Sequence, residues 1–155
     1  MSSNGSKNSG GNANLKRATP PTSYDVLDTP GTNSLCGFYA VISSLEAQMP
    51  DLKRPTVEDL LKVYNTSEMA ELNAAMGQTN TNYFSADQVA GTVYAWGNTC
   101  GINLQLGCLV EGGAPLLLPT PTSDAADVRV LWIYNDNADV LQKTGLNHFS
   151  GLRIQ

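Results

Sequence analysis

One cysteine of the chain lies where a protein would activate a thiol. Cys36 follows the polar residues Asn33 and Ser34 and begins a segment with helical apolar spacing. At the N-terminus of a helix, a thiol faces unpaired backbone N–H groups and the positive end of the macrodipole, and both favour the thiolate. The alternative is that Cys36 is a small buried hydrophobic residue, which is the commoner state of a free cysteine.

A cysteine nucleophile needs a base, and the chain contains one histidine. His148 begins a predicted strand near the C-terminus, and we hypothesise that the fold brings it to Cys36. Period-two alternation places Ser150 on the same face as His148, where its hydroxyl can orient the imidazole, and Phe149 on the other face. The alternative is a structural histidine at the end of a strand.

The composition limits the size of the fold and the partners of the chain. With 155 residues, 41% of them hydrophobic, the chain fits a single domain with a substantial core. Nine basic and fourteen acidic residues give a net charge of −5, which argues against nucleic acid as the main partner. Neither an apolar run that spans a bilayer nor a signal peptide is recognisable. We therefore expect a monomeric, cytoplasmic protein that does not act at a membrane.

The three cysteines, Cys36, Cys100 and Cys108, do not form a recognisable metal or disulfide pattern. An odd, sparse set argues against a disulfide framework and fits a reducing compartment. The chain lacks the CxxC and HxxxH spacings of zinc sites, so we expect neither a metal nor another cofactor. Cys108 falls on the apolar side of a predicted strand and is expected in the core.

Residues 1–21 differ in composition from the rest of the chain. They are mostly Ser, Asn, Gly and Lys and close with two prolines. Such a segment buries too little apolar surface to offset its ordering entropy, so we expect a disordered tail over residues 1–21 and one domain over residues 22–155.

Four segments in the first two thirds of the chain have the apolar spacing of amphipathic helices. They are residues 36–49, the segment after Pro55, the segment from Thr66 or Ser67 to Gly77, and residues 85–97. Thr56 is the expected N-cap of the second helix. Ser85 and Gln88 have the spacing of a capping box, and Gly97 is the expected end of that helix.

The last third of the chain has the patterns of strands. Residues 102–110 alternate and predict a half-buried strand, whereas residues 128–134 are apolar at nearly every position, as in a central strand covered on both faces. Residues 116–118 fit a short strand or a plug under a loop, and residues 147–154 form the last expected strand. Because helices precede strands, we predict an α+β fold with a small mostly antiparallel or mixed sheet.

Three segments together resemble the ovarian tumour (OTU) type of papain-like cysteine protease. They are Asn33–Ala40, Val128–Tyr134 and Asn147–Ser150. That family has an Asp-Gly-x-Cys-like turn that opens a long helix, and a late strand that carries His followed by an aromatic residue. The order of the expected elements over residues 24–155 also agrees with the family.

The resemblance implies a papain-like fold and hydrolysis of peptide or isopeptide bonds, commonly the removal of ubiquitin or a ubiquitin-like modifier. His148 would take the proton of Cys36, the thiolate would attack the carbonyl, and water would hydrolyse the acyl-enzyme. Backbone N–H groups of residues 33–36 would stabilise the oxyanion. The implied partner is a protein substrate, and the implied mechanism needs no cofactor.

The chain departs from the family at two positions. Asn33 stands where the family usually has Asp, and a neutral amide can still shape the turn or add a donor. Ser150 stands where members often have Asp or Asn, and a hydroxyl stabilises an imidazolium less than a carboxylate does. Some relatives take the third residue from upstream of the cysteine, which makes Asp28, and less so Asp25, candidates. Asn147 and Asp136 are weaker ones.

These departures give a first testable prediction. Asp28→Ala is expected to lower turnover more than Ser150→Ala, because a carboxylate stabilises the imidazolium of His148 and a hydroxyl does not carry the charge. The measurement is the turnover of both variants beside the parent. Parent-level turnover in Asp28→Ala removes Asp28 from the site.

Two other functions fit the same residues. Compact variants of the OTU-type fold cut viral polyproteins, so a polyprotein-processing cysteine protease is one alternative. The other is a catalytically weak OTU-like module that binds a protein partner, and the residues at positions 33 and 150 support it.

Overall fold

The structure is a computed structural model that describes residues 19–30, 35–75, 77, 84–120, 127–143 and 147–155. Within these ranges it contains five helices and five strands. They are β1 (Tyr24–Val26), α2 (Cys36–Gln48), α3 (Val57–Tyr64), α4 (Ser67–Ala75), α5 (Ala86–Thr99), β2 (Leu104–Val110), β3 (Leu116–Leu117), β4 (Arg129–Asn135), α6 (Ala138–Leu141) and β5 (Phe149–Ile154). The expected disordered tail falls mainly on residues 1–18, which lie outside the described residues.

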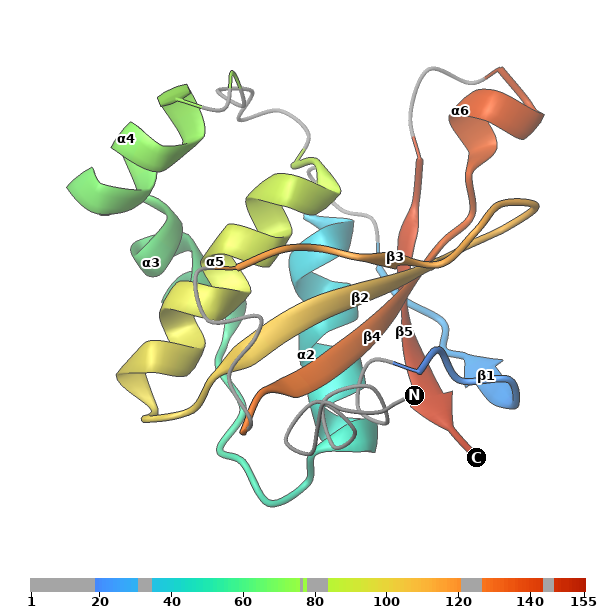
Figure 1. The fold of residues 1–155 in the computed structure, drawn as a ribbon, viewed down its shortest axis with the longest axis horizontal. Coiled ribbons are helices and arrows are strands. Elements are labelled where there is room, and N and C mark those ends of the chain that lie inside the picture. The colour runs from blue at the N-terminus through green and yellow to red at the C-terminus, as the bar shows by residue number, and fades with distance from the viewer. Residues whose placement is uncertain (1–18, 31–34, 76, 78–83, 121–126, 144–146) are drawn as a thin grey trace, which may run out of the picture.

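The strands form one mixed, open sheet in the order β1-β5-β4-β2-β3 (Figure 1). The pairing of β2 with β4 is parallel, and the other three pairings are antiparallel. The α+β class and the mixed sheet are therefore confirmed. Residues 116–118 contribute a short strand rather than a plug, and β4 lies in the interior of the sheet as its apolar sequence predicts.

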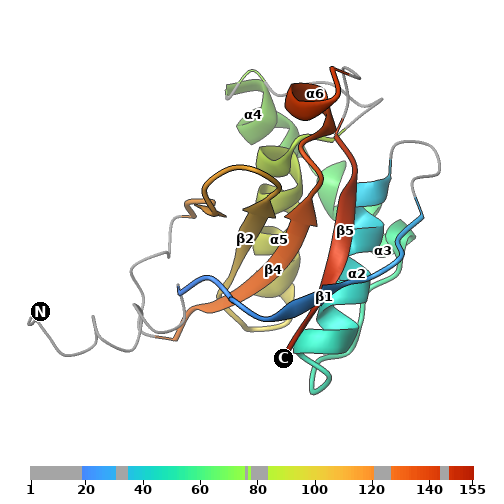
Figure 2. The same ribbon diagram turned by 90° about the vertical axis from the view of Figure 1, so that its right-hand side faces the viewer.

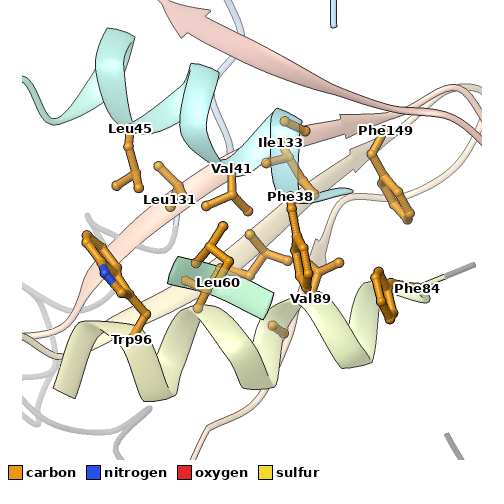
Figure 3. Packing of buried hydrophobic residues seen from close by; sticks show 14 of the residues in the cluster. Phe38, Val41, Leu45, Leu60, Phe84, Val89, Trp96, Leu131, Ile133 and Phe149 are labelled. Atoms are coloured by element: carbon orange, nitrogen blue, oxygen red, sulfur yellow. The ribbon is translucent and has the colours of Figure 1, made fainter. Parts of the chain in front are cut away.

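Helices α2 and α5 cover one face of the sheet (Figure 2). Helix α3 packs on both of them, and α4 packs on α3 and α5. The core between this layer and the sheet contains side chains of α2, α5 and the three inner strands (Figure 3). Among them are Phe38, Leu45, Val89, Trp96, Leu106, Leu131, Ile133 and Phe149. The apolar positions of α2 recur at steps of three and four because this stripe faces the sheet.

The opposite face of the sheet carries a second, smaller cluster of Leu109, Trp132 and Leu152. The indole of Trp132 lies across Gly107 of the neighbouring strand, where a Cβ atom would be 2.6 Å from the ring. Residues 104–109 of β2 are consequently buried on both faces. The prediction of a half-buried strand is wrong because the indole of Trp132 covers Gly107, which the alternating pattern places on the exposed face.

The helix starts follow the local sequence closely. Thr56 caps α3 in a capping box with Asp59, and Ser85 caps α5 in a capping box with Gln88, as expected for the second of these boxes. Helix α5 continues past Gly97 to Thr99, so the expected end is two residues too early. Gly97 is small because it contacts β2: a Cβ there would lie 2.9 Å from the Cβ of Leu104.

Helix α2 is bonded directly to the two strands beneath it. The Ser44 hydroxyl accepts a hydrogen bond from the Leu152 backbone N–H (2.9 Å). The Gln48 amide donates to the carbonyl oxygens of Trp132 (2.7 Å) and Leu152 (2.9 Å), and its oxygen accepts from the Trp132 N–H (3.0 Å). Gly151 allows this close approach, since a Cβ there would be 2.6 Å from the Cβ of Ser43.

Candidate functional site

Cys36 is the first residue of α2, as the sequence predicts. Its side chain is only 5% exposed and belongs to the main core cluster. Leu35 occupies the N-cap position, and its own side chain forms no capping hydrogen bond. The backbone N–H groups of Phe38 and Tyr39 donate to the Leu35 carbonyl (3.0 Å each), so the N–H groups of Cys36 and Gly37 are the ones that precede the first bonds of the helix. Asn33, the other expected member of this turn, lies outside the described residues.

His148 directly precedes β5 and is partly exposed. Its backbone N–H donates to Oδ1 of Asp136 (2.9 Å), and its carbonyl accepts from the Asp136 N–H (3.1 Å). These bonds prolong the antiparallel pairing of β4 and β5, in which Asn135 is opposite Phe149. The histidine backbone is thus held in line with the strand that follows it.

Cys36 and His148 are carried to the same end of the molecule by α2 and β5. The two elements run in the same direction, because the start of α2 lies at the start of β5 and Ser44 bonds Leu152 further along. A Cβ on Gly37 would be 3.6 Å from Cδ2 of Phe149. Figure 2 shows α2 and β5 beginning together at the upper end of the view. The chain neighbours of the thiol and of the imidazole, Gly37 and Phe149, therefore lie close together.

The two side chains approach this junction from different sides. Phe149 and Gly151 face α2, whereas Leu152 belongs to the cluster on the opposite face of the sheet. Strand alternation assigns His148 and Ser150 to that opposite face. On this placement the imidazole would have to pass around the end of the sheet, past the first residue of β5, to meet Cys36.

Asp28 lies beside β5, two to three positions along from His148. Its neighbours bond one residue of that strand: the Leu27 N–H donates to the Gly151 carbonyl (2.9 Å), and the Thr29 hydroxyl accepts from the Gly151 N–H (3.0 Å). The Asp28 side chain is exposed, and its carboxylate has no hydrogen-bond partner among the described residues. The structure therefore places Asp28 beside the strand that follows His148. The buried Thr29 that anchors it was not foreseen.

The other candidate third residues are distributed along β5. Ser150 is buried, opposite Tyr134 in the register. Asp25 is at the far end of the strand, where it forms an ion pair with Arg153 (3.8 Å), so the structure separates it from the site. Asp136 and Asn147 adjoin His148. The latter two are the weaker candidates of the sequence analysis, and the signal for them was the polar Asn-Asp-Asn turn that ends β4.

The remaining cysteines have different surroundings. Cys108 lies fully buried in β2, and burial raises the pKa of its thiol to about 12. That confirms the prediction of a core cysteine and makes its thiolate inaccessible at neutral pH. Cys100 is exposed at the end of α5.

The described residues offer no sign of a metal centre or of a membrane segment. No three His, Cys, Asp or Glu side chains gather there in a way that could hold a metal ion. None of the helices in the same ranges has the length and apolar character needed to cross a bilayer. No protein-family model, curated protein or solved structure matches the chain.

Proposed function

We propose that the chain is a cysteine-dependent hydrolase of peptide or isopeptide bonds, similar to OTU-type proteases, with Cys36 as nucleophile and His148 as base. The observation that carries the proposal is the close approach of Gly37 to Phe149, where a Cβ on the glycine would be 3.6 Å from the ring, because it brings the start of α2 to the start of β5. A helix N-terminus beside a strand that histidine directly precedes is the arrangement such a thiol–imidazole pair needs.

The proposed reaction uses groups of this junction. His148 takes the proton from Sγ of Cys36, and the thiolate attacks the carbonyl carbon of the scissile bond. Backbone N–H groups at the start of α2, including that of Cys36, stabilise the oxyanion. The carbon–nitrogen bond then breaks, and the imidazolium returns its proton to the departing amine. Water hydrolyses the thioester in a second cycle and regenerates the thiol.

A protein that carries ubiquitin or a ubiquitin-like modifier is the proposed substrate, and this part of the proposal rests on the resemblance to the OTU family. Asp28 is the proposed third residue. Its carboxylate is exposed beside β5, whereas Ser150 is buried and uncharged. The expected ranking of Asp28→Ala and Ser150→Ala stays a prediction.

A protein-binding module without turnover is the second candidate. It is favoured by the burial of Cys36 within the apolar core and by the assignment of His148 to the opposite face of the sheet. A thiol in this state behaves as a small hydrophobic residue. The two candidates differ in whether the Cys36 sulfur reacts with a bound electrophile.

The test is a ubiquitin probe with a C-terminal electrophile, followed by intact-mass measurement. The hydrolase is expected to gain the mass of one probe, and Cys36→Ala is expected to gain none. Cys100→Ala is the matched control, because it removes an exposed thiol outside the junction and should leave the adduct unchanged. Tight binding of the probe without an adduct supports the second candidate. An adduct that persists in Cys36→Ala contradicts the proposed nucleophile.

A further inference from the structure

We infer that Asp136 is a positioning residue for His148, an inference that rests on the proposed function. One oxygen of its carboxylate accepts two backbone hydrogen bonds. Oδ1 of Asp136 accepts hydrogen bonds from the backbone N–H groups of His148 (2.9 Å) and Ala138 (3.0 Å). The backbone N–H of Asp136 also donates to the carbonyl of His148 (3.1 Å). The end of β4 thus holds both backbone groups of the histidine.

A second side chain strengthens the same link. Oδ1 of Asn147 accepts from the backbone N–H of Asp139 (2.8 Å) in the first turn of α6. Together, three hydrogen bonds connect residues 136–139 with residues 147 and 148. We call this set the β4–β5 clasp. It fixes the backbone of His148 on both sides, although the residue precedes the strand proper.

The clasp matters because the imidazole must reach around the end of the sheet to meet Cys36. The direction of its Cα–Cβ bond is set by the backbone of His148, and that backbone is oriented by Asp136. Misplacement of a reacting group by about 1 Å can lower a rate about 100-fold. Loss of the Asp136 acceptor leaves the His148 N–H without its partner and frees the end of the strand.

The two bonds to Oδ1 require an acceptor and not a charge. Asparagine has an oxygen in the same place and can accept both N–H groups, whereas alanine cannot. Asp136→Asn and Asp136→Ala therefore separate the geometry of the clasp from the presence of a carboxylate. Asp136→Ser is a third variant with a shorter acceptor. Asp127→Ala is the matched control: this exposed carboxylate precedes the other end of β4 and accepts from the Asn103 amide (2.9 Å).

The experiment measures the pH–rate profile of Cys36 alkylation by iodoacetamide in a Cys100→Ser background, with His148→Ala as reference. Asp136→Ala is expected to react about 10- to 100-fold more slowly at pH 7 and to adopt the profile of His148→Ala. Asp136→Asn and Asp127→Ala should stay within about 3-fold of the parent and keep its profile. Loss of stability alone would expose the buried Cys36 and speed its alkylation, so a slower reaction reports on positioning.

Hydrogen exchange at the His148 amide separates the two hypotheses. Asp136→Ala is expected to accelerate that exchange, and Asp136→Asn is not. If Asp136→Ala accelerates exchange but keeps the parent profile, the positioning role is overturned. If the parent and His148→Ala share one profile, the proposed function fails instead, while the exchange data still report on the clasp. If Asp136→Ala does not fold, a parent-like profile in Asp136→Ser with accelerated exchange overturns the inference.

Discussion

His148→Ala is expected to lower kcat/KM toward a fluorogenic amide at the C-terminus of ubiquitin by about 10²- to 10⁴-fold, the contribution typical of a positioned general base. The chain has one histidine, so no second imidazole can replace it. Because His148 is partly exposed and its described bonds use backbone atoms, the variant should keep its fold. The measurement is kcat/KM beside the melting temperature of both proteins.

Added imidazole distinguishes the loss of a base from a change in the structure of the site. If His148 acts as a base, millimolar imidazole should restore part of the activity of His148→Ala and have no effect on Cys36→Ala. His148→Gln is the matched variant, since its amide keeps similar volume without a basic nitrogen. An unchanged kcat/KM in His148→Ala would remove the histidine from the mechanism and leave the binding module as the better account.

The parts of the fold that the sequence predicted are those with local causes. Caps and apolar periodicity depend on residues three and four positions apart, and the starts of α3 and α5 accordingly lie where Thr56 and Ser85 place them. Cys36 at the start of α2 belongs to the same class. These features need no knowledge of what the segment contacts.

The parts that escaped prediction depend on contacts between distant segments. Trp132 packs on Gly107 because β2 pairs with β4 in parallel, and a local sequence pattern does not predict that pairing. Helix α6 has one turn and carries little periodicity. Gly97 shows the same effect at a helix end, because a glycine needed for close packing resembles a helix stop in the sequence.

The third residue of the candidate site was the least predictable feature for the same reason. Asp28 comes to β5 through the bonds of Leu27 and Thr29 to Gly151, more than a hundred residues away along the chain. Asp136 comes to His148 through the pairing of β4 with β5. Two residues after His148 the sequence has Ser150 and not a carboxylate. The carboxylates of Asp28 and Asp136 come near this strand from segments that are distant along the chain.

Gln48→Glu is expected to lower the free energy of unfolding by about 3 kcal/mol at pH 7. In the parent, the Gln48 amide nitrogen donates to the carbonyls of Trp132 and Leu152, and this bridge joins α2 to both strands. A carboxylate would direct an oxygen at those two carbonyl oxygens and leave them without a donor. The measurement is urea unfolding of both proteins over a series of pH values.

The free energy of unfolding of Gln48→Glu should depend on pH, and the direction of that dependence follows from the pKa of the new carboxyl. Burial and the facing carbonyl oxygens raise the pKa of the new carboxyl above about 4.3, because they favour the protonated acid, which can still donate. The variant should therefore approach the parent stability below pH of about 4.3 and lose about 1.4 kcal/mol per pH unit as the pH rises toward the folded-state pKa. Gln48→Ala should lose stability without this slope.

Glu46→Gln is the matched control, because it exchanges the same two side chains on the exposed side of α2, where Glu46 forms a surface ion pair with Arg54 (3.3 Å). Its effect should stay within about 1 kcal/mol. If the stability of Gln48→Glu and that of the parent changed with pH in the same way, water and not the Gln48 amide would satisfy the carbonyl oxygens of Trp132 and Leu152. In that case the junction of α2 with β5 would depend on the packing of Gly151 under the helix and on the hydrogen bond between Ser44 and Leu152.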